Sequence, residues 1–405
     1  MIKNICIVGG GTAGWMSAAY LSKKGFAVTL VESKNIPLIG VGESTLPAMT
    51  TFCKELGLSE NEWMNKVQSV HKLGICHKGW KKDSINDWWH WFEYDRNKHD
   101  ARYDHVENNT LPTSIFEYAY HIDAIKFGNE VCKPVALENN CKHIIDDVVS
   151  VLTNDNGITS IVTNEHGHIV ADFYIDCTGF AKVLAKEVGI TYKNFKHVIN
   201  DRAIACPQES LDKINRFTIT RKMSTGWCWE IALQNRRGAG YVYSSKYISD
   251  ESAIEEYIGL YPNTNREKLR VLKFNSEYTE MPIYKNCAVV GLSSGFLEPL
   301  EATSIWLIQY FVEGVYKTIT SDRSPEVFNK AQSKIMNEIY YFILCHYTLS
   351  DHDDTEYWRY YKELEKELNT KDYVRSMALQ KDSNPEKYIK MFHPYSWWCM
   401  NTFLN

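Results

Sequence analysis

The fold is decided by the stretch "NICIVGGGTAGWMSAAYLSKKGFAVTLVE", Asn4 to Glu32. A short apolar run rich in β-branched residues is followed by glycines, and then by apolar residues that recur at helical spacing. A second apolar run ends at Glu32. This order predicts a strand, a tight turn, a helix and a second strand, which together form a βαβ unit.

The glycines of the turn have the spacing Gly9-x-Gly11-x-x-Gly14. Such glycines let the backbone approach a pyrophosphate, and the helix that follows offers it unpaired N–H groups and the positive end of its dipole. Glu32 ends the second strand, 18 residues after Gly14, where it can accept hydrogen bonds from ribose hydroxyls. We therefore predict that this unit binds a dinucleotide.

Two later stretches bear on which dinucleotide is bound. "ADFYIDCTGF" (Ala171 to Phe180) and "CAVVGLSSGF" (Cys287 to Phe296) are predicted to be later strands of the same sheet, each ending in a turn of small residues. A nicotinamide dinucleotide needs little beyond the βαβ unit, whereas the isoalloxazine of FAD must be held by further segments. These stretches supply such segments, so FAD is favoured over NAD.

The sequence predicts an α/β fold in which a Rossmann-type FAD-binding domain is assembled from discontinuous segments, beside a second, mainly helical substrate layer. The last ~90 residues carry charged and aromatic positions at helical spacing, as in "YWRYYKELEKEL". The FAD-binding module is assigned to residues 1–80, 121–190 and 281–315, and the substrate-binding module to residues 81–120, 191–280 and 316–405.

Composition and charge exclude several classes of protein. Among the 405 residues 44% are hydrophobic and 23% charged, which leaves little room for long disordered tracts. The formal charge of -5 argues against a nucleic-acid partner. No apolar stretch approaches the ~20 residues of a membrane span, and the N-terminus lacks the features of a signal peptide. We expect a cytoplasmic protein without a membrane partner.

Cysteine and histidine give no metal-binding pattern. The 11 cysteines include no C-x-x-C pair, so we expect them to be reduced and mostly buried. Histidine and acidic residues cluster in "CHYTLSDHDD", Cys345 to Asp354, without the ligand spacing of a known metal scaffold. We interpret this cluster as a solvated helix end and predict no metal site.

Six motifs, in their order and spacing, resemble the flavin-dependent tryptophan halogenase family: "IVGGGTAGWM", "IPLIGVGEST", "HKLGICHKGW", "GWCWEI", "GYVYSS" and "GLSSGFLEPLEATSI". The resemblance runs from residue 1 to about residue 355. It implies that reduced FAD (FADH2) forms a flavin hydroperoxide, which oxidises a halide ion (Cl, Br or I) to hypohalous acid. The acid then passes through a tunnel to an electron-rich aromatic small molecule of the indole or phenol type. A separate flavin reductase would supply the FADH2.

The resemblance also implies two catalytic residues. Lys72, in "VHKLGI", occupies the position of the family's catalytic lysine, and it lies eight residues before Trp80 as the family pattern requires. That register favours it over Lys78. Glu301, in "EPLEAT", occupies the position of the essential glutamate, which takes the ring proton. Glu298 is interpreted as structural.

Halide is expected at the backbone N–H groups of Thr303 and Ser304, where a helix begins. The family more often has Ser-Thr-Gly where this chain has Ala302, Thr303 and Ser304, so the halide preference stays open. The residues predicted to contact FAD are Gly9, Gly11, Thr12, Ala13, Gly14, Glu32, Ser33, Ile36, Ile39, Val41, Glu43, Leu292 and Ile305.

Trp227 and Trp229, in "STGWCWEIAL", would point to the same face of a strand. In the family this segment lies between flavin and substrate, where a wall of indole prevents direct contact and hence hydroxylation. The alternative is that both are core aromatics. The family usually continues with Ile-Pro, whereas here Ile231 is followed by Ala232.

Other interpretations remain open at this stage. A flavin-dependent aromatic monooxygenase or a non-catalytic flavoprotein would share the nucleotide motifs, but neither needs Lys72 together with Glu301. Beyond residue 355 the likeness fades, and we expect free tryptophan to be a poor substrate because the extended C-terminal region of the longer relatives is missing. The aromatic residues of "NDWWHWFEY" could stack on a flat substrate or pack against the last helices. A homo-oligomer is possible.

Overall fold

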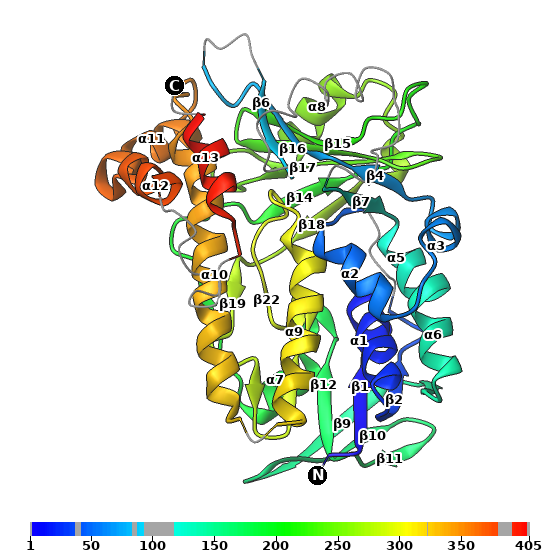
Figure 1. Cartoon of the computed structure of the whole chain (residues 1–405). Helices are drawn as coiled ribbons and strands as arrows, with labels where there is room; N and C mark the ends of the chain where they lie inside the picture. The colour runs from blue at the N-terminus through cyan, green and yellow to red at the C-terminus, as the bar shows by residue number, and fades with distance from the viewer. Residues whose placement is uncertain are drawn as a thin grey trace.

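The computed structural model describes residues 2–36, 42–82, 87–92, 117–321, 323–379 and 391–402. Two sheets organise the chain (Figure 1). The six-stranded nucleotide sheet has the order β20-β21-β12-β1-β2-β8, and the seven-stranded second sheet has the order β18-β14-β17-β16-β15-β5-β6. In Figure 1 the long helices α9 (Thr303–Ile319) and α10 (Pro325–Thr348) stand beside the nucleotide sheet and extend toward the second sheet.

The nucleotide sheet is built from segments far apart in the sequence. Its central strand β1 (Asn4–Val8) lies parallel to β2 (Ala27–Glu32) on one side and to β12 (Phe173–Asp176) on the other. The remaining strands are β8 (Lys142–Ile145), β21 (Cys287–Val289) and β20 (Ile283–Tyr284). The two stretches predicted to be later strands of this sheet, at Ala171 and Cys287, do join it as β12 and β21.

Both faces of the nucleotide sheet are covered, which explains the continuous apolar runs of its central strands. One face packs under α1 (Thr12–Lys23), which also contacts α9. The other face packs on α7 (Val183–Val188) and on a three-stranded sheet. That sheet is made of β9 (Val148–Asn154), β10 (Gly157–Thr163) and β11 (Gly167–Ile169). Beside α1 lie α5 (Ala124–Lys126), η2 (Phe127–Cys132) and α6 (Lys133–Glu138).

The second sheet corrects the expectation of a mainly helical substrate layer. Its strands are β18 (Arg270–Lys273), β14 (Arg202–Ala205), β17 (Arg237–Tyr243), β16 (Gly226–Ala232), β15 (Phe217–Met223), β5 (Gly74–Lys78) and β6 (Trp88–Trp91). Residues alternate between two cores along β16, because Trp227 and Trp229 belong to the main core and Cys228 to the core under α8 (Asp250–Leu260). This alternation of period two is typical of a β-strand. The charged helical pattern belongs only to the C-terminal part of the chain.

Helices do dominate the C-terminal part, as predicted. After α10 come α11 (Glu356–Leu368), α12 (Thr370–Leu379) and α13 (Pro394–Thr402). The ring nitrogen of Trp88, on β6, donates a 2.7 Å hydrogen bond to the carbonyl of Cys399 in α13. The aromatic strand β6, from the stretch "NDWWHWFEY", therefore packs on the last helix. All 11 cysteines lie among the described residues and are buried thiols, as expected. Within the described ranges, no helix has the length and apolar character that crossing a bilayer requires.

Short elements connect the two sheets. They include the helices α2 (Ala48–Glu55) and α3 (Glu60–Lys66), and the three-stranded sheet β3-β7-β4, made of Glu43–Ser44, Ala119–Ile122 and Val70–Lys72. A further small sheet joins β13 (Lys193–Asn194), β19 (Glu277–Tyr278) and β22 (Gly295–Phe296). β5 follows β4 directly and pairs with β15, so the chain crosses from one sheet system to the other just after Lys72.

Candidate active site

The glycine-rich turn lies between β1 and α1 and needs its glycines for space. Gly9 has a φ of +111°, and a Cβ there would lie 2.3 Å from the carbonyl oxygen of Cys177 at the end of β12. A Cβ at Gly14 would lie 1.8 Å from the carbonyl oxygen of Gly9. Gly11 caps α1 without a side-chain hydrogen bond, so the first N–H groups of the helix remain available to an anion.

Glu32 lies directly against this turn. A Cβ at Gly10 would fall 1.6 Å from Oε2 of Glu32, so the bare glycine makes room for the carboxylate. Oε1 of Glu32 lies 2.7 Å from Nε2 of His143, on the neighbouring strand β8, and 3.8 Å from the ammonium of Lys133. Neither His143 nor Lys133 was predicted from the sequence, since His143 reaches Glu32 through the pairing of β8 with β2 and Lys133 reaches it from α6.

The other residues predicted to contact FAD gather from three segments. A Cβ at Gly291 would lie 2.6 Å from the Cβ of Ala13, so η5 (Gly291–Ser293), which contains Leu292, packs on the start of α1. Thr12 donates a 2.9 Å hydrogen bond from Oγ1 to the carbonyl of Ala124. Ile305 is buried in α9.

The predicted strap between β2 and Thr45 is described only in part. Ser33 and the exposed Ile36 follow the end of β2, whereas Ile39 and Val41 lie outside the described residues. Glu43 is the first residue of β3, and burial raises the pKa of its carboxyl group to about 7.

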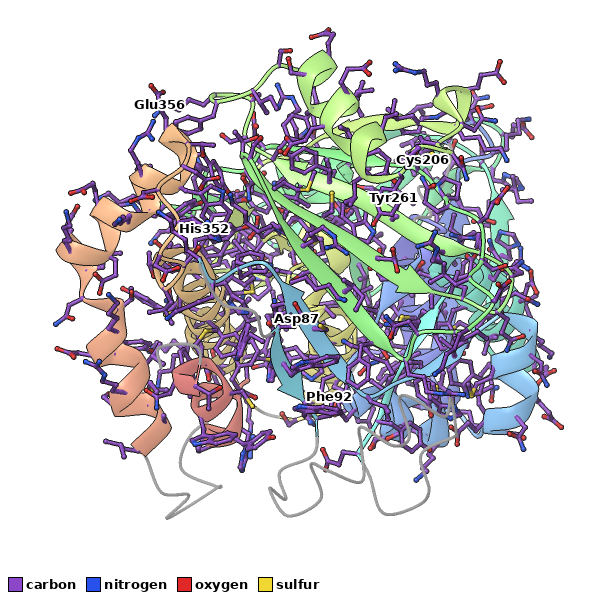
Figure 2. All side chains as sticks on the ribbon, turned by 90° about the horizontal axis from the view of Figure 1, so that it is seen from above. Asp87, Phe92, Cys206, Tyr261, His352 and Glu356 are labelled. Carbon is purple, nitrogen blue, oxygen red and sulfur yellow. The ribbon has the colours of Figure 1, made fainter. Side chains whose placement is uncertain are left out.

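Lys72 is the last residue of β4, and its side chain is fully buried. Its ammonium donates a 3.1 Å hydrogen bond to the carbonyl of Thr45, and it lies 4.7 Å from the centre of the Phe92 ring. Burial lowers the pKa of Lys72 to about 7, although the negative charge of Glu301 works in the opposite direction. Figure 2 labels Phe92 and Asp87, which follow and precede β6 at the edge of the second sheet.

The two candidate lysines occupy different environments. Lys78 is the last residue of β5. Its side chain is 36% exposed, and its ammonium lies 3.5 Å from a carboxylate oxygen of Asp87. It is therefore a half-exposed partner of a surface acid. Lys72, by contrast, is fully buried, and its assignment as the catalytic lysine stays a prediction.

Glu301 is buried beneath three histidines that come from three different elements. Oε2 accepts a hydrogen bond from Nδ1 of His90 at 3.0 Å. Oε1 lies 2.8 Å from Nε2 of His346 and 3.7 Å from Nε2 of His77. Neither of these contacts is aligned as a hydrogen bond, so Oε1 and both Nε2 atoms are buried without a hydrogen-bond partner among the described residues. We refer to Lys72, His77, His90, Glu301 and His346 as the Lys72–Glu301 cluster.

Charge and burial act in opposite directions on this cluster. Burial by itself would raise the pKa of Glu301, but the neighbouring His90 holds that pKa well below its usual range. Burial lowers the pKa of His77 well below its usual value. Glu301 is therefore an ionised carboxylate inside a dry site, where its interactions are strong.

The position of His346 corrects the interpretation of "CHYTLSDHDD". Cys345, His346 and Tyr347 belong to the last turn of α10 and are fully buried, so only the end of this stretch is solvated. Helical spacing turns His346 toward Glu301, while the acidic residues that follow it lie beyond the helix. His77 and His90 were missed as well, because they lie on paired strands and share no sequence spacing with Glu301.

Glu298 differs from Glu301 in having every oxygen satisfied. Oε2 accepts a 2.6 Å hydrogen bond from Nδ2 of Asn200, and Oε1 accepts one from the hydroxyl of Tyr347. Tyr357 in turn donates to Oδ1 of Asn200 at 3.0 Å. Burial raises the pKa of Glu298. This closed network agrees with the interpretation of Glu298 as structural.

The predicted halide site lies at the start of α9. Ala302, the N-cap, has a φ of +56° and makes no capping hydrogen bond from its side chain. Thr303 is buried and Ser304 half-buried, and both lie in the first turn of this 17-residue helix. The first N–H groups of a helix have no partner within the helix, and those of Thr303 and Ser304 come two and three residues after Glu301 in the chain.

Trp227 and Trp229 form one side of β16, as predicted. Both are buried, and their ring centres lie 6.3 Å apart. They belong to the same buried cluster as Leu300 and Ile305, at the start of α9. Trp229 is paired with Gly240 on β17, where a Cβ would lie 2.1 Å from its ring. The absence of a side chain at Gly240 therefore leaves room for the Trp229 ring against β17.

Comparison with known proteins follows the same motifs. The sequence profile described as tryptophan halogenase matches residues 4–106 and 95–402. The chain is 32% identical to the tryptophan 6-halogenase SttH of Streptomyces toxytricini, over 88% of this chain and 80% of that protein. It is 33% identical to a 7-chloro-L-tryptophan 6-halogenase of Kutzneria sp. (strain 744), over 87% of this chain and 80% of that protein.

Solved structures agree over almost the whole chain. The crystal structure of the Streptomyces toxytricini enzyme superposes with a TM-score of 0.87 at 28% identity, covering 99% of this chain and 90% of that one. A flavin-dependent halogenase from Xanthomonas campestris gives a TM-score of 0.89 at 29% identity, covering 100% and 89%. These matches do not favour a monooxygenase or a non-catalytic flavoprotein. The chain therefore belongs to the tryptophan halogenase family.

Proposed function

We propose that this chain uses FADH2, O2 and halide to halogenate an electron-rich aromatic ring, with Lys72 and Glu301 as its catalytic residues. One observation carries the assignment of these two residues. A buried lysine with a lowered pKa and a buried carboxylate oxygen that has no hydrogen-bond partner among the described residues lie within electrostatic reach of each other. Perturbed groups of this kind are concentrated at catalytic sites.

The reaction divides into two steps in separate regions. Reduced flavin and O2 supply the oxidation of halide: FADH2, O2, Cl⁻ and H⁺ give FAD, HOCl and H2O. The aromatic ring then takes the halogen of HOCl and loses a proton, which yields the halogenated ring and water. Only the second step requires the Lys72–Glu301 cluster.

Lys72 can act in either protonation state, because its pKa of about 7 lies near a neutral working pH. As an ammonium it donates a hydrogen bond to the departing oxygen of hypohalous acid, and as an amine it can hold the halogen covalently. Glu301 then accepts the ring proton on Oε1, which has no hydrogen-bond partner in the part of the chain that the structure describes, while His90 holds Oε2.

Halide is proposed to bind at the first turn of α9, where the N–H groups of Thr303 and Ser304 have no side-chain cap. Bromide and iodide are proposed as alternatives to chloride, because heavier halides are easier to oxidise. Trp227 and Trp229 are proposed to separate the flavin from the aromatic substrate. The residues proposed to hold FAD are those of the glycine-rich turn together with Glu32 and η5.

The substrate is proposed to be a flat, electron-rich aromatic molecule of the indole or phenol type. The described surroundings of Glu301 support an aromatic substrate, since Trp80, Trp88 and Phe342 pack against the histidines that contact Glu301. Several of the matched relatives are named for tryptophan itself. A direct comparison of kcat/KM for free tryptophan and for simple indoles under one halide separates a dedicated amino-acid site from a general aromatic one.

A separate flavin reductase is the proposed source of FADH2, because the sequence contains a single dinucleotide fingerprint. The test is to incubate the protein with FAD, a reductase, NADH and each halide over a panel of aromatic compounds. Mass spectrometry should detect halogen isotope patterns only when all components are present. NADH oxidation by the protein alone should stay at background, and a hydroxylated product in place of a halogenated one would refute the proposal.

A further inference from the structure

Three buried ligand atoms of the Lys72–Glu301 cluster face a common point. Nε2 of His77, Nε2 of His346 and Oε1 of Glu301 all lie within 4.8 Å of one another. All three atoms are buried, and none has a hydrogen-bond partner among the described residues. Proton transfer to Glu301 explains why its oxygen is unpaired, but it does not explain two unpaired imidazole nitrogens.

The opposite atom of each of these side chains is already held. Nδ1 of His346 donates to the carbonyl of Phe342 at 2.9 Å, since a carbonyl can only accept. Nδ1 of His77 lies 2.8 Å from Oγ1 of Thr220, which can accept its proton in the same way. The carbonyl of Phe342 therefore leaves a lone pair on Nε2 of His346, and the hydroxyl of Thr220 allows the same tautomer in His77. Oε2 of Glu301 is held by His90.

This arrangement is that of a metal-binding shell. Histidine ligands in proteins almost always donate their second ring N–H to a carbonyl or another polar group, which fixes the tautomer and aims the ligand nitrogen. Two histidines and one carboxylate form a donor set used by zinc and other first-row metals, with a further position left open. In a tetrahedral zinc site the ligand atoms lie about 3.4 Å apart. The distances from Oε1 to the two nitrogens, 2.8 and 3.7 Å, bracket that spacing.

We propose that His77, Glu301 and His346 form a binding site for a divalent transition-metal ion of the zinc type, and that a bound ion blocks halogenation by occupying Glu301. The metal site itself does not depend on the proposed function; only the inhibition rests on the role of Glu301. The aromatic surroundings favour it further, because His77 stacks on Trp88 at 4.1 Å and His346 packs against Trp80. A dry shell of this kind strengthens the attraction between ligand and ion.

The direct test measures binding of Co²⁺ and Zn²⁺ to the metal-free protein. Co²⁺ should give the visible absorption of a cobalt site at one ion per chain, and Zn²⁺ should displace it. His77→Phe and His346→Gln should each weaken Zn²⁺ binding by at least about tenfold, since outer-shell partners alone change affinity by about 10- to 100-fold. If a ligand variant does not fold, Thr220→Val offers a second test, because it keeps all three ligands and removes only the partner of His77. Its Zn²⁺ affinity should fall by about tenfold.

A surface histidine provides the matched control. His166 lies 2.8 Å from Asp146 with its side chain 46% exposed, so His166→Gln should leave the binding unchanged. Absence of a stoichiometric Co²⁺ site in the wild type would overturn the proposal. So would equal Zn²⁺ binding by the wild type and by both His77→Phe and His346→Gln.

Inhibition is measured separately with photoreduced FAD, so that no reductase is exposed to zinc. Zn²⁺ should stop formation of the halogenated product over the same concentration range in which it binds, while FAD affinity stays unchanged. If Zn²⁺ binds at His77 and His346 and halogenation continues at full rate, the metal site stands and the proposed role of Glu301 fails. Loss of FAD binding on addition of Zn²⁺ would instead place the ion at Glu32 and His143 and overturn the proposal.

Discussion

The glycine-rich turn and the Lys72–Glu301 cluster are assembled in different ways. The turn, its helix and Glu32 come from one continuous stretch of chain, and β1 pairs directly with β2. The cluster takes its members from β4, β5, β6, the loop before α9 and the end of α10. A local unit can bind a cofactor by backbone geometry alone, whereas a set of buried charged groups requires packing from many elements. This difference predicts that the two regions can be disabled independently.

The largest expected effect belongs to Glu301→Gln. The change keeps the shape of the side chain but removes the base that accepts the ring proton, so product formation should fall by at least about 100-fold, in the range typical of acid–base catalysis. FAD affinity should stay at the wild-type value, because Glu301 lies outside the turn. Product formation is followed by mass spectrometry and FAD binding by flavin fluorescence. Parallel loss of both properties would mean that the two regions are coupled.

Gly10→Val should affect the other region first. A Cβ at this position falls 1.6 Å from Oε2 of Glu32, so the carboxylate must leave its place over the turn. We expect FAD affinity to fall by at least about tenfold, which corresponds to about 1.4 kcal/mol of lost interaction. Gly259→Ala in α8 is the control, because nothing lies within 4 Å of its Cβ. Unchanged FAD affinity in Gly10→Val would refute the assignment of this turn.

Stability against pH should reveal the buried amine of the cluster. The pKa of Lys72 in the folded state, about 7, is below that of an unfolded lysine, so between these two values the unfolded chain binds more protons. The free energy of unfolding of the wild type should therefore rise with pH relative to Lys72→Met, by at most about 1.4 kcal/mol per pH unit. The gain should begin above pH 7 and be complete near the pKa of unfolded lysine. Urea unfolding of both proteins at pH 7, 8 and 9 measures it, and parallel curves would show that Lys72 has an ordinary pKa.

The smallest expected effect concerns the wall proposed between the two regions. Trp227→Ala should open a path between flavin and substrate, so that a detectable fraction of the product is hydroxylated instead of halogenated. Val242→Ala, opposite Trp227 on β17, removes apolar volume from the same core and is the control. If both variants lose stability and neither gives hydroxylated product, the tryptophans are core residues only.

Local sequence predicted the nucleotide half of the molecule well. The βαβ unit and two distant strands of its sheet were identified because each strand carries its own apolar run and small-residue turn. The second sheet was not predicted, since its strands come from residues 74–91 and 202–273 and only the tertiary structure shows that they pair.

Within the candidate site, Lys72 and Glu301 were found only through family motifs. The three histidines around Glu301 were not predicted. Strand pairing and the last turn of α10 bring them together, and their spacing in the sequence gives no sign of this contact. Burial also could not be derived from residue type: His346, in a stretch rich in acidic residues, is fully buried while Asp354, eight positions later, is half exposed.

The central claim, that halogen transfer is separate from flavin chemistry, is tested most directly by a single turnover of Lys72→Met. Photoreduced FAD, O2, bromide and an indole are mixed with this variant, with Lys78→Met and with the wild type. Flavin oxidation is then followed by absorbance, and brominated product is measured in the same samples. We expect flavin oxidation at the wild-type rate in all three proteins, with product lost by at least about 100-fold only in Lys72→Met. Wild-type product from Lys72→Met, or equal loss of product in Lys78→Met, would contradict it.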